Sequence, residues 1–225
     1  MWGGPILDED HEYAAWDSFL VELLAEEGIG ISPEELARRV VAATRRCECN
    51  PRLAVLWELV RPDVTRFHRL KDGLRAFQRR HLAEEYIPSL RPGAKEALEV
   101  LAGRYTLALA GNQPTWIVDY LESRVLQYFE WKKVSEEMGV AKPDPLFFRM
   151  ILDGLGLPPS EAVMVGDRLD HDILPARLLG MHAVRMLAGP YAEQVPSSPL
   201  HCPNRTIRSL DELPSALESM KTVQY

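Results

Sequence analysis

The sequence has few cysteines, no long hydrophobic run and no excess of positive charge. Only three of its 225 residues are cysteine, Cys47, Cys49 and Cys202, and a low, odd count predicts free thiols in a reducing compartment. No apolar run approaches the length of a transmembrane helix. The few apolar residues before Asp8 do not form the pattern of a signal peptide. We therefore expect a cytoplasmic protein that does not bind membranes.

The chain also lacks the basic surface that a general nucleic-acid-binding protein needs. It has 26 lysines and arginines against 33 aspartates and glutamates, which gives a formal net charge of −7. This balance excludes nucleic acid as the expected partner. Within an acidic protein, an anionic substrate must meet either a local cationic group or a bound metal ion.

Two sequence patterns divide the chain. Residues 13–90 show mainly helical periodicity, and Ser32-Pro33-Glu34-Glu35 has the composition of a helix start. From residue 91 onward, short apolar runs alternate with helical segments, which predicts a doubly wound α/β fold with a parallel sheet. The predicted strands are residues 105–110, 129–135, 162–165, 182–187 and 206–207. The predicted helices are residues 94–101, 114–122, 145–155, 173–179 and 213–220.

The most informative segment is the apolar run 162–165, which ends in Gly166-Asp167 and is followed by Asp170 and Asp172. Such a run is typical of a strand buried on both faces, so its acids lie at the carboxyl edge of the sheet, where open α/β sheets bind ligands. Carboxylates this close repel one another, and Mg²⁺, which prefers oxygen ligands, would relieve the repulsion. An acidic turn that caps the next helix is the alternative, and both roles are compatible.

Two further segments carry candidate binding groups. Lys142 precedes Pro143-Asp144-Pro145, and a lysine fixed there would neutralise a phosphate or a developing negative charge, unless it is an ordinary surface lysine. Gly111-Asn112 follows the predicted strand 105–110. Its backbone N–H groups and amide side chain suit anionic oxygens, although Gly-Asn is also common in plain turns.

Taken in order, these segments resemble the haloacid dehalogenase superfamily. Asp167 with Asp172 resembles the family's fourth motif, Lys142 its third, and Ala110-Gly111-Asn112 its second. The resemblance implies a Rossmann-like core (residues 1–12 and 89–225) and a helical cap (residues 13–88) that closes over the site.

The family's first motif, Asp-x-Asp-Gly-Thr, is altered in this chain. If Asp8 is taken as the acid that follows this motif, Met1 occupies the place of the nucleophile and Gly3 that of the second aspartate, with Gly4 and Pro5 on its Gly and Thr. The strand that should precede the motif is also missing. Because loss of a central strand would leave a sheet edge unpaired, we expect that this sequence starts late, and real loss of the active site is the alternative.

The resemblance implies a Mg²⁺-dependent phosphatase that acts on a small phosphate ester through an aspartyl-phosphate. Asp167 and Asp172 would bind Mg²⁺, and Lys142 would pair with the nucleophile and the phosphate. The phosphate oxygens would be bound by Gly111, Asn112 and Lys142. A metal-independent 2-haloacid dehalogenase and a non-catalytic binding protein are the alternatives. Monomer and homodimer both remain open, and the sequence does not name the substrate.

Overall fold

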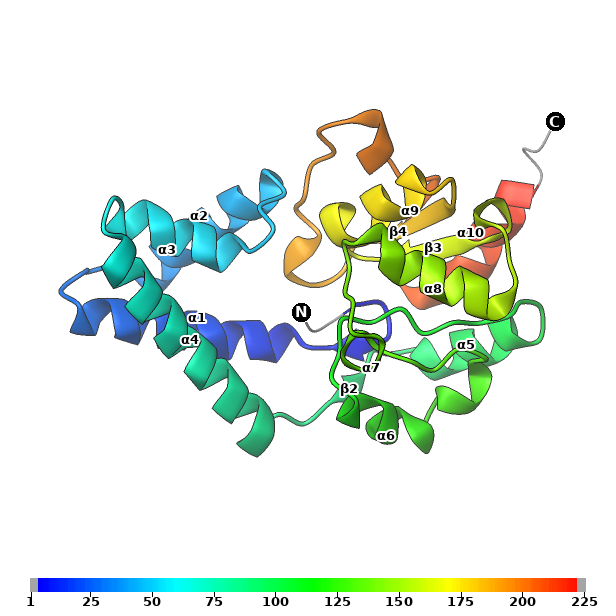
Figure 1. The fold of residues 1–225 in the computed structure, drawn as a ribbon, viewed down its shortest axis with the longest axis horizontal. Helices are drawn as coiled ribbons and strands as arrows, with labels where there is room; N and C mark the ends of the chain where they lie inside the picture. The colour runs from blue at the N-terminus through cyan, green and yellow to red at the C-terminus, as the bar shows by residue number, and fades with distance from the viewer. Residues whose placement is uncertain (1–3, 222–225) are drawn as a thin grey trace. The chain divides into compact units, whose positions relative to one another are not determined.

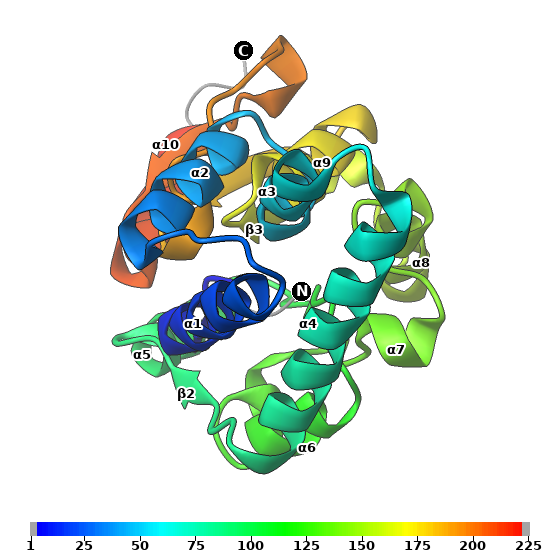
Figure 2. The same ribbon diagram turned by 90° about the vertical axis from the view of Figure 1, so that its left-hand side faces the viewer.

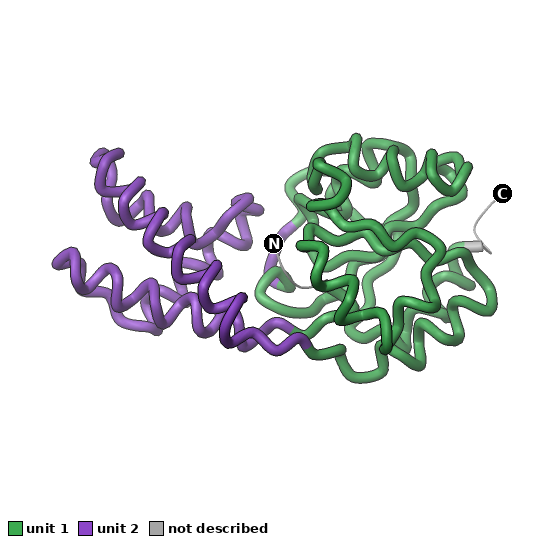
Figure 3. The backbone as a smooth tube through the Cα atoms, turned by 60° about the horizontal axis from the view of Figure 1, so that its bottom comes forward, with its two compact units in different colours: residues 1–8, 89–192, 196–225 green, residues 9–88, 193–195 purple. Residues whose placement is uncertain are grey.

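The chain folds into two compact units. The structure is a computed structural model that describes residues 4–221, except for the side chain of Lys221. One unit comprises residues 1–8, 89–192 and 196–225, and the other comprises residues 9–88 and 193–195 (Figure 3). Within residues 4–221, no helix is both long and apolar enough to cross a bilayer.

The unit of residues 9–88 is helical, as predicted (Figure 2). Its helices are α1 (Asp10–Glu26), α2 (Pro33–Arg45), α3 (Pro51–Val60) and α4 (Val64–Glu84). The predicted helix start is confirmed, because the Glu35 backbone N–H donates to the Ser32 hydroxyl oxygen at 3.2 Å. Leucines spaced for helical burial fill the core of this unit, among them Leu20, Leu24, Leu36, Leu56, Leu70 and Leu74.

The other unit contains a parallel sheet. Its strands are β3 (Val163–Gly166), β4 (His182–Met186) and β5 (Arg205–Ile207), in the order β3-β4-β5. In the register of the sheet, Val163 pairs with His182 and Val184 with Arg205. Three of the five predicted strands, and the α/β fold class, are thus confirmed.

Helices cover both faces of this sheet (Figure 1). Val163 and Val165 pack on one face with residues of α5 (Ala94–Ala102) and α10 (Leu213–Lys221). Met164 packs on the opposite face with residues of α8 (Pro145–Leu155) and α9 (Leu174–Leu178). Because neighbouring strand residues point to opposite faces, the apolar run that predicted β3 is what a sheet buried on both sides requires. The remaining helices are α6 (Trp116–Glu122) and α7 (Ser135–Met138), with short turns at η1 (Leu126–Tyr128), η2 (Pro159–Glu161), η4 (Gly189–Tyr191), η5 (Pro199–His201) and η6 (Leu210–Glu212).

A short antiparallel ribbon was not predicted. β1 (Leu7–Asp8) pairs with β2 (Ser89–Leu90), with Leu7 opposite Leu90. The helical unit lies between these two strands in the sequence. The ribbon therefore joins the two places where the chain leaves and re-enters the sheet-containing unit.

Two predicted strands are wrong. Within the described residues, segments 105–110 and 129–135 share a single parallel bridge, between Ala108 and Trp131, in place of a ladder. The Leu109 backbone N–H donates to the Trp131 carbonyl at 2.9 Å. Both segments carry the apolar sequence of a strand, but a strand forms only as far as a neighbour pairs with it, and this contact ends after one residue pair.

Candidate active site

The predicted acidic segment directly follows β3. The strand ends at Gly166 and Asp167 is the next residue. The chain then forms a π-helical turn, η3 (Leu169–Ile173), which contains Asp170 and Asp172 and leads into α9. The three carboxylates therefore lie at the carboxyl end of a parallel strand, the usual position of ligands in such sheets.

Asp172 forms a buried ion pair with Lys142, which comes from the segment between α7 and α8. The Lys142 Nζ donates to the Asp172 Oδ1 at 2.5 Å, and 13% of the lysine side chain and 2% of the aspartate side chain are exposed. The Arg168 backbone N–H donates to the other carboxylate oxygen at 3.0 Å. Hydrogen bonds to both oxygens are what a buried ion pair needs to offset its loss of hydration. The fold thus brings together two predicted site residues that are 30 positions apart.

Gly166 permits this arrangement by its lack of a side chain. A Cβ atom at this position would lie 2.4 Å from both Cβ and Cγ of Asp172. Because non-bonded carbon atoms do not approach this closely, any larger residue would displace Asp172 from the end of β3. The glycine of the Gly-Asp pair is therefore explained by a close approach.

The Asn112 side chain contacts the backbone of Lys142. Its Nδ2 donates to the Lys142 carbonyl at 2.8 Å, and its Oδ1 accepts from the Lys142 backbone N–H at 2.8 Å. These two bonds attach the loop after residues 105–110 to the backbone of Lys142. The Asn112 side chain therefore positions the lysine backbone, and its contact with phosphate oxygens stays a prediction.

Asp167 is a buried carboxyl group close to the negative charge of Asp172. Burial, followed by the negative charge of Asp172, raises the pKa of Asp167 to about 7, although Lys142 and Arg168 act in the opposite direction. A divalent cation beside the carboxylate would supply the missing positive charge, and carboxylate oxygens are ligands that Mg²⁺ accepts. The residues present therefore fit a hard cation.

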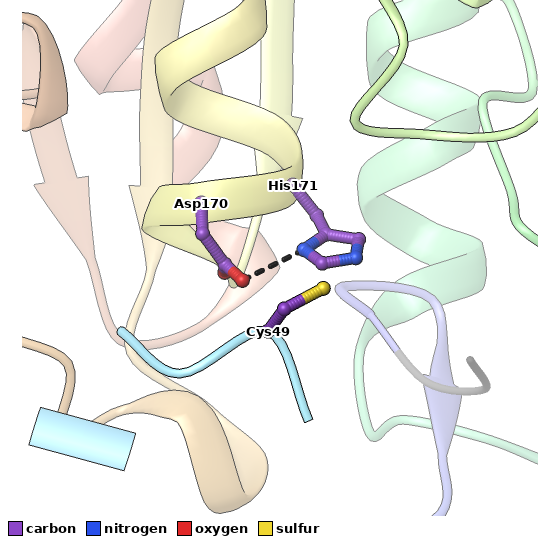
Figure 4. Close-up of side chains that lie close together, drawn as sticks. All are labelled: Cys49, Asp170 and His171. Carbon is purple, nitrogen blue, oxygen red and sulfur yellow. Dashed lines mark hydrogen bonds and ion pairs between the residues drawn. The ribbon is translucent and has the colours of Figure 1, made fainter. Parts of the chain in front are cut away.

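Asp170 is neutralised within its own turn, by groups that the sequence analysis did not single out. The Arg168 Nε donates to the Asp170 Oδ1 at 2.9 Å, and the His171 Nδ1 lies 2.8 Å from Oδ2 (Figure 4). The guanidinium also stacks over the Tyr191 ring, 4.0 Å from its centroid. Burial raises the pKa of Asp170, but the hydrogen bonds from His171 and Arg168 outweigh burial and hold the pKa below its ordinary value. The repulsion expected among three carboxylates is thus confined to Asp167 and Asp172.

A cavity of about 510 Å³ extends from these charged groups into the apolar interior of the same unit. Gly111, Lys142, Asp167 and Asp172 line it together with many apolar side chains. Gln113, which the sequence analysis did not identify as a site residue, also lines the cavity. Its buried Oε1 has no hydrogen-bond partner among the described residues. Its only sequence signal was its place directly after Gly111-Asn112.

The start of the described chain lies beside the acids. A Cβ atom on Gly4 would lie 3.8 Å from the Asp167 Oδ1, and the Gly4 carbonyl accepts from the Arg91 Nε at 3.0 Å. Met1 and Gly3, which the resemblance places on the two catalytic aspartates, lie outside the described residues.

Comparison with known proteins gives a consistent result. The HAD-hydrolase-like family model matches residues 139–213, which include Lys142, Asp167 and Asp172. This third of the chain is therefore similar to the haloacid dehalogenase-like hydrolases. The HAD phosphatase structure from Thermococcus onnurineus, at 24% identity and a TM-score of 0.58, has the same fold over 96% of this chain and 94% of its own.

Two curated relatives that this chain matches are named as phosphatases. A glyceraldehyde 3-phosphate phosphatase from Methanocaldococcus jannaschii is 40% identical over 94 residues, which is 42% of this chain and 40% of that protein. A phosphoserine phosphatase from Thermus thermophilus is 43% identical over 72 residues, which is 32% of this chain and 29% of that protein. The chain therefore spans less than half the length of these curated relatives.

Proposed function

We propose that this protein is a Mg²⁺-dependent phosphatase of small phosphorylated metabolites. The observation that carries the proposal is the buried Lys142–Asp172 pair beside Asp167, at the carboxyl end of a parallel strand. The phosphatase names of the two curated relatives support the same reaction class.

In the proposed site, Lys142 and Gly111 bind the phosphate. The Lys142 ammonium donates to Asp172, and Asn112 holds the backbone of Lys142, so the lysine brings positive charge to the cavity without a large loss of side-chain entropy. Gly111 lines the same cavity, and its backbone N–H is a suitable donor to a phosphate oxygen. Positioning and charge neutralisation are the main requirements of phosphoryl transfer.

Asp167 and Asp172 are the residues that would hold Mg²⁺. When bound, the metal ion would neutralise charge on the phosphoryl oxygens. Asp172 would serve mainly as an orienting group, because Lys142 and the Arg168 backbone already contact its two oxygens.

The residues described so far do not include the nucleophile that attacks phosphorus. By family resemblance, a carboxylate oxygen attacks phosphorus, the ester P–O bond breaks, and a second carboxylic acid protonates the departing alcohol. Water then attacks phosphorus, releasing inorganic phosphate and the carboxylate. The corresponding positions here are Met1 and Gly3, so we expect the present chain to bind Mg²⁺ and phosphate with little turnover.

Those same two residues favour a second candidate function, a HAD-fold protein that binds a phosphorylated metabolite without hydrolysing it. Neither methionine nor glycine has a group that attacks phosphorus. The two candidates differ in whether a carboxylate at position 1 confers turnover.

A binding experiment tests the site in the present chain. We expect calorimetric titration to show Mg²⁺ binding that Asp167→Asn weakens by about tenfold or more, and inorganic phosphate binding that Lys142→Ala abolishes. Asp144→Asn is the matched control, because this exposed aspartate caps α8 two residues beyond Lys142 and asparagine keeps the cap. Unchanged Mg²⁺ affinity in Asp167→Asn would refute the metal site.

A turnover experiment separates the candidate functions. The variant has an apolar segment added before position 1, aspartate in place of Met1 and aspartate in place of Gly3. It is assayed on a panel of phosphate esters with Mg²⁺. Phosphate release that EDTA or Asp167→Ala abolishes supports the phosphatase. No release from a folded protein that still binds phosphate supports the binding protein. Metal-independent chloride release from 2-chloropropionate would support the dehalogenase instead.

A further inference from the structure

The loop of residues 4–8 forms part of the wall of the cavity that contains the acids. Residues 4–7 line this cavity together with Asp167. Gly4 lies against the acid, because a Cβ atom on this glycine would be 3.8 Å from the Asp167 Oδ1. Only 8% of Asp167 is exposed. A loop that lies against the carboxylate therefore helps to keep water away from it.

The Arg91 side chain joins the two ends of this loop. Its Nε donates to the Gly4 carbonyl at 3.0 Å, and its Nη1 lies 3.7 Å from the Asp8 Oδ1. Arg91 follows β2 directly, and 13% of its side chain is exposed. Because a guanidinium carries several donors in one rigid plane, a single side chain can hold both ends of the loop at once.

Backbone hydrogen bonds hold the rest of the loop independently of that side chain. β1 pairs with β2 in the antiparallel ribbon, and the Arg91 backbone N–H donates to the Ile6 carbonyl at 2.8 Å. These bonds remain when the side chain at position 91 is replaced. A substitution there should therefore release the Gly4 end of the loop, which lies beside Asp167, and leave the ribbon paired.

We propose that Arg91 is a positioning residue for the metal site, an inference that rests on the proposed binding of Mg²⁺ by Asp167. By fixing Gly4, Arg91 keeps the loop against the carboxylate. A carboxylate shielded from water attracts a cation more strongly than a hydrated one, because the effective dielectric constant around it is lower. A loop that is already fixed also loses less conformational entropy when the metal ion binds.

A direct effect of the arginine charge on the metal ion would have the opposite sign. A guanidinium near a cation site repels the cation, so removal of the charge alone would strengthen Mg²⁺ binding. Removal of the contact with Gly4 would weaken it. The direction of the change in Mg²⁺ affinity therefore distinguishes positioning from charge repulsion.

Calorimetric titration of the full chain with Mg²⁺ tests the role of Arg91. We expect Arg91→Met, which removes the donors and keeps an unbranched side chain, to weaken binding by about tenfold. Arg91→Lys keeps the charge but has one nitrogen in place of the planar fork, so we expect a smaller loss. Arg149→Met is the matched control, because Arg149 is exposed on α8, and it should bind Mg²⁺ as the parent does.

Two further measurements separate positioning from a general loss of structure. In the Asp167→Asn background, Arg91→Met should change the remaining Mg²⁺ affinity by less than about twofold, because the carboxylate through which the loop acts is gone. The amide of residue 91 donates to the Ile6 carbonyl, and its hydrogen exchange should stay as slow in Arg91→Met as in the parent.

Each outcome decides the inference. Weaker binding in Arg91→Met that lysine partly restores, and that disappears in the Asp167→Asn background, supports it. Unchanged or stronger Mg²⁺ binding overturns it, and so does an equal loss in both backgrounds or faster exchange at residue 91. If Arg91→Met does not fold, Arg91→Lys decides by the same criteria.

The experiment also distinguishes this inference from the proposed function. A parent chain that does not bind Mg²⁺ refutes the proposed metal site, and the role of Arg91 with it. A parent that binds Mg²⁺ no more tightly than Arg91→Met refutes the role of Arg91 and leaves the metal site in place.

Discussion

At the scale of single residues, this site depends on close approaches and on unequal neutralisation of its acids. Asp170 is held by Arg168 and His171, and Asp172 by Lys142, whereas burial and Asp172 raise the pKa of Asp167. The three carboxylates look alike in the sequence, but their surroundings raise the pKa of Asp167 and lower that of Asp170. Asp167 is thus the acid that gains most from a bound cation.

Asp167 makes the stability of the metal-free protein depend on pH. Its folded pKa of about 7 exceeds the ordinary value of 3.8, so between these values the folded state binds more protons than the unfolded state. Stability from this group is therefore present at low pH, falls as pH rises from about 4, and is lost above about 7. We expect Asp167→Asn to be more stable than the parent at about pH 8, with an advantage larger than at about pH 5 by on the order of 2 to 3 kcal/mol.

Urea unfolding of both proteins in EDTA at the two pH values measures this difference. An Asn variant that is equally destabilised at both values would show that Asp167 is not under electrostatic stress. Asp144→Asn is again the matched control, because it makes the same substitution at an exposed aspartate outside the acidic turn.

Gly166→Ala tests the close approach of Asp172. The added methyl would lie 2.4 Å from two carbons of the Asp172 side chain, so we expect a loss of about 1 to 3 kcal/mol of stability and weaker binding of phosphate and Mg²⁺. Gly30→Ala is the control, because nothing lies within 4 Å of its Cβ position and its φ is not positive. Phosphate affinity and stability equal to the parent would contradict the assigned role of Gly166.

At the scale of elements, a second glycine with a close contact, Gly154, lets helix α8 pack against Trp131. A Cβ atom on Gly154, within α8, would lie 2.1 Å from the Trp131 Cζ3. The indole thus occupies the space that a side chain would need. This contact fixes where α8 packs beside the bridge between Ala108 and Trp131.

Two opposing effects decide the outcome of Gly154→Ala. Helix propensity favours alanine by up to about 1 kcal/mol, whereas overpacking against a ring costs about 1 to 3 kcal/mol. We expect net destabilisation in urea unfolding, partly reversed by the further change Trp131→Phe. Gly103→Ala, whose nearest contact would be at 3.6 Å, should be neutral or slightly stabilising. A stabilised Gly154→Ala would show that the ring moves away at little cost.

At the scale of the whole molecule, the helical unit has a core of its own. Leu20, Leu36 and Leu56 are fully buried among residues of α1 to α4. A unit whose apolar surface is covered by its own helices can fold without the rest of the chain. We therefore expect the helical unit to be stable by itself, without contacts from the sheet-containing unit.

A fragment of residues 9–88 tests this division. We expect a helical circular dichroism spectrum and a cooperative thermal transition, because the apolar positions of all four helices are retained. A gradual, non-cooperative loss of signal would show that the helical unit needs the sheet-containing unit for its stability.

Local sequence patterns determined much of the fold. The Ser32 cap and the apolar run 162–165 depend on neighbours within a few residues, so they predicted α2 and β3 closely. The Gly-Asp and lysine motifs also identified Asp167, Asp172 and Lys142 as a candidate site, and the fold brings Lys142 to Asp172.

Only the tertiary structure decided which polar groups pair and which strands find partners. Asn112 contacts Lys142, which is distant in sequence, and Gln113 lines the cavity. Arg168 neutralises Asp170 within a π-helical turn, and the hydrophobic periodicity of the sequence does not predict the geometry of this turn. Residues 105–110 have the composition of a strand but lack a ladder, because hydrogen bonds between strands need a neighbour whose position the segment itself does not specify.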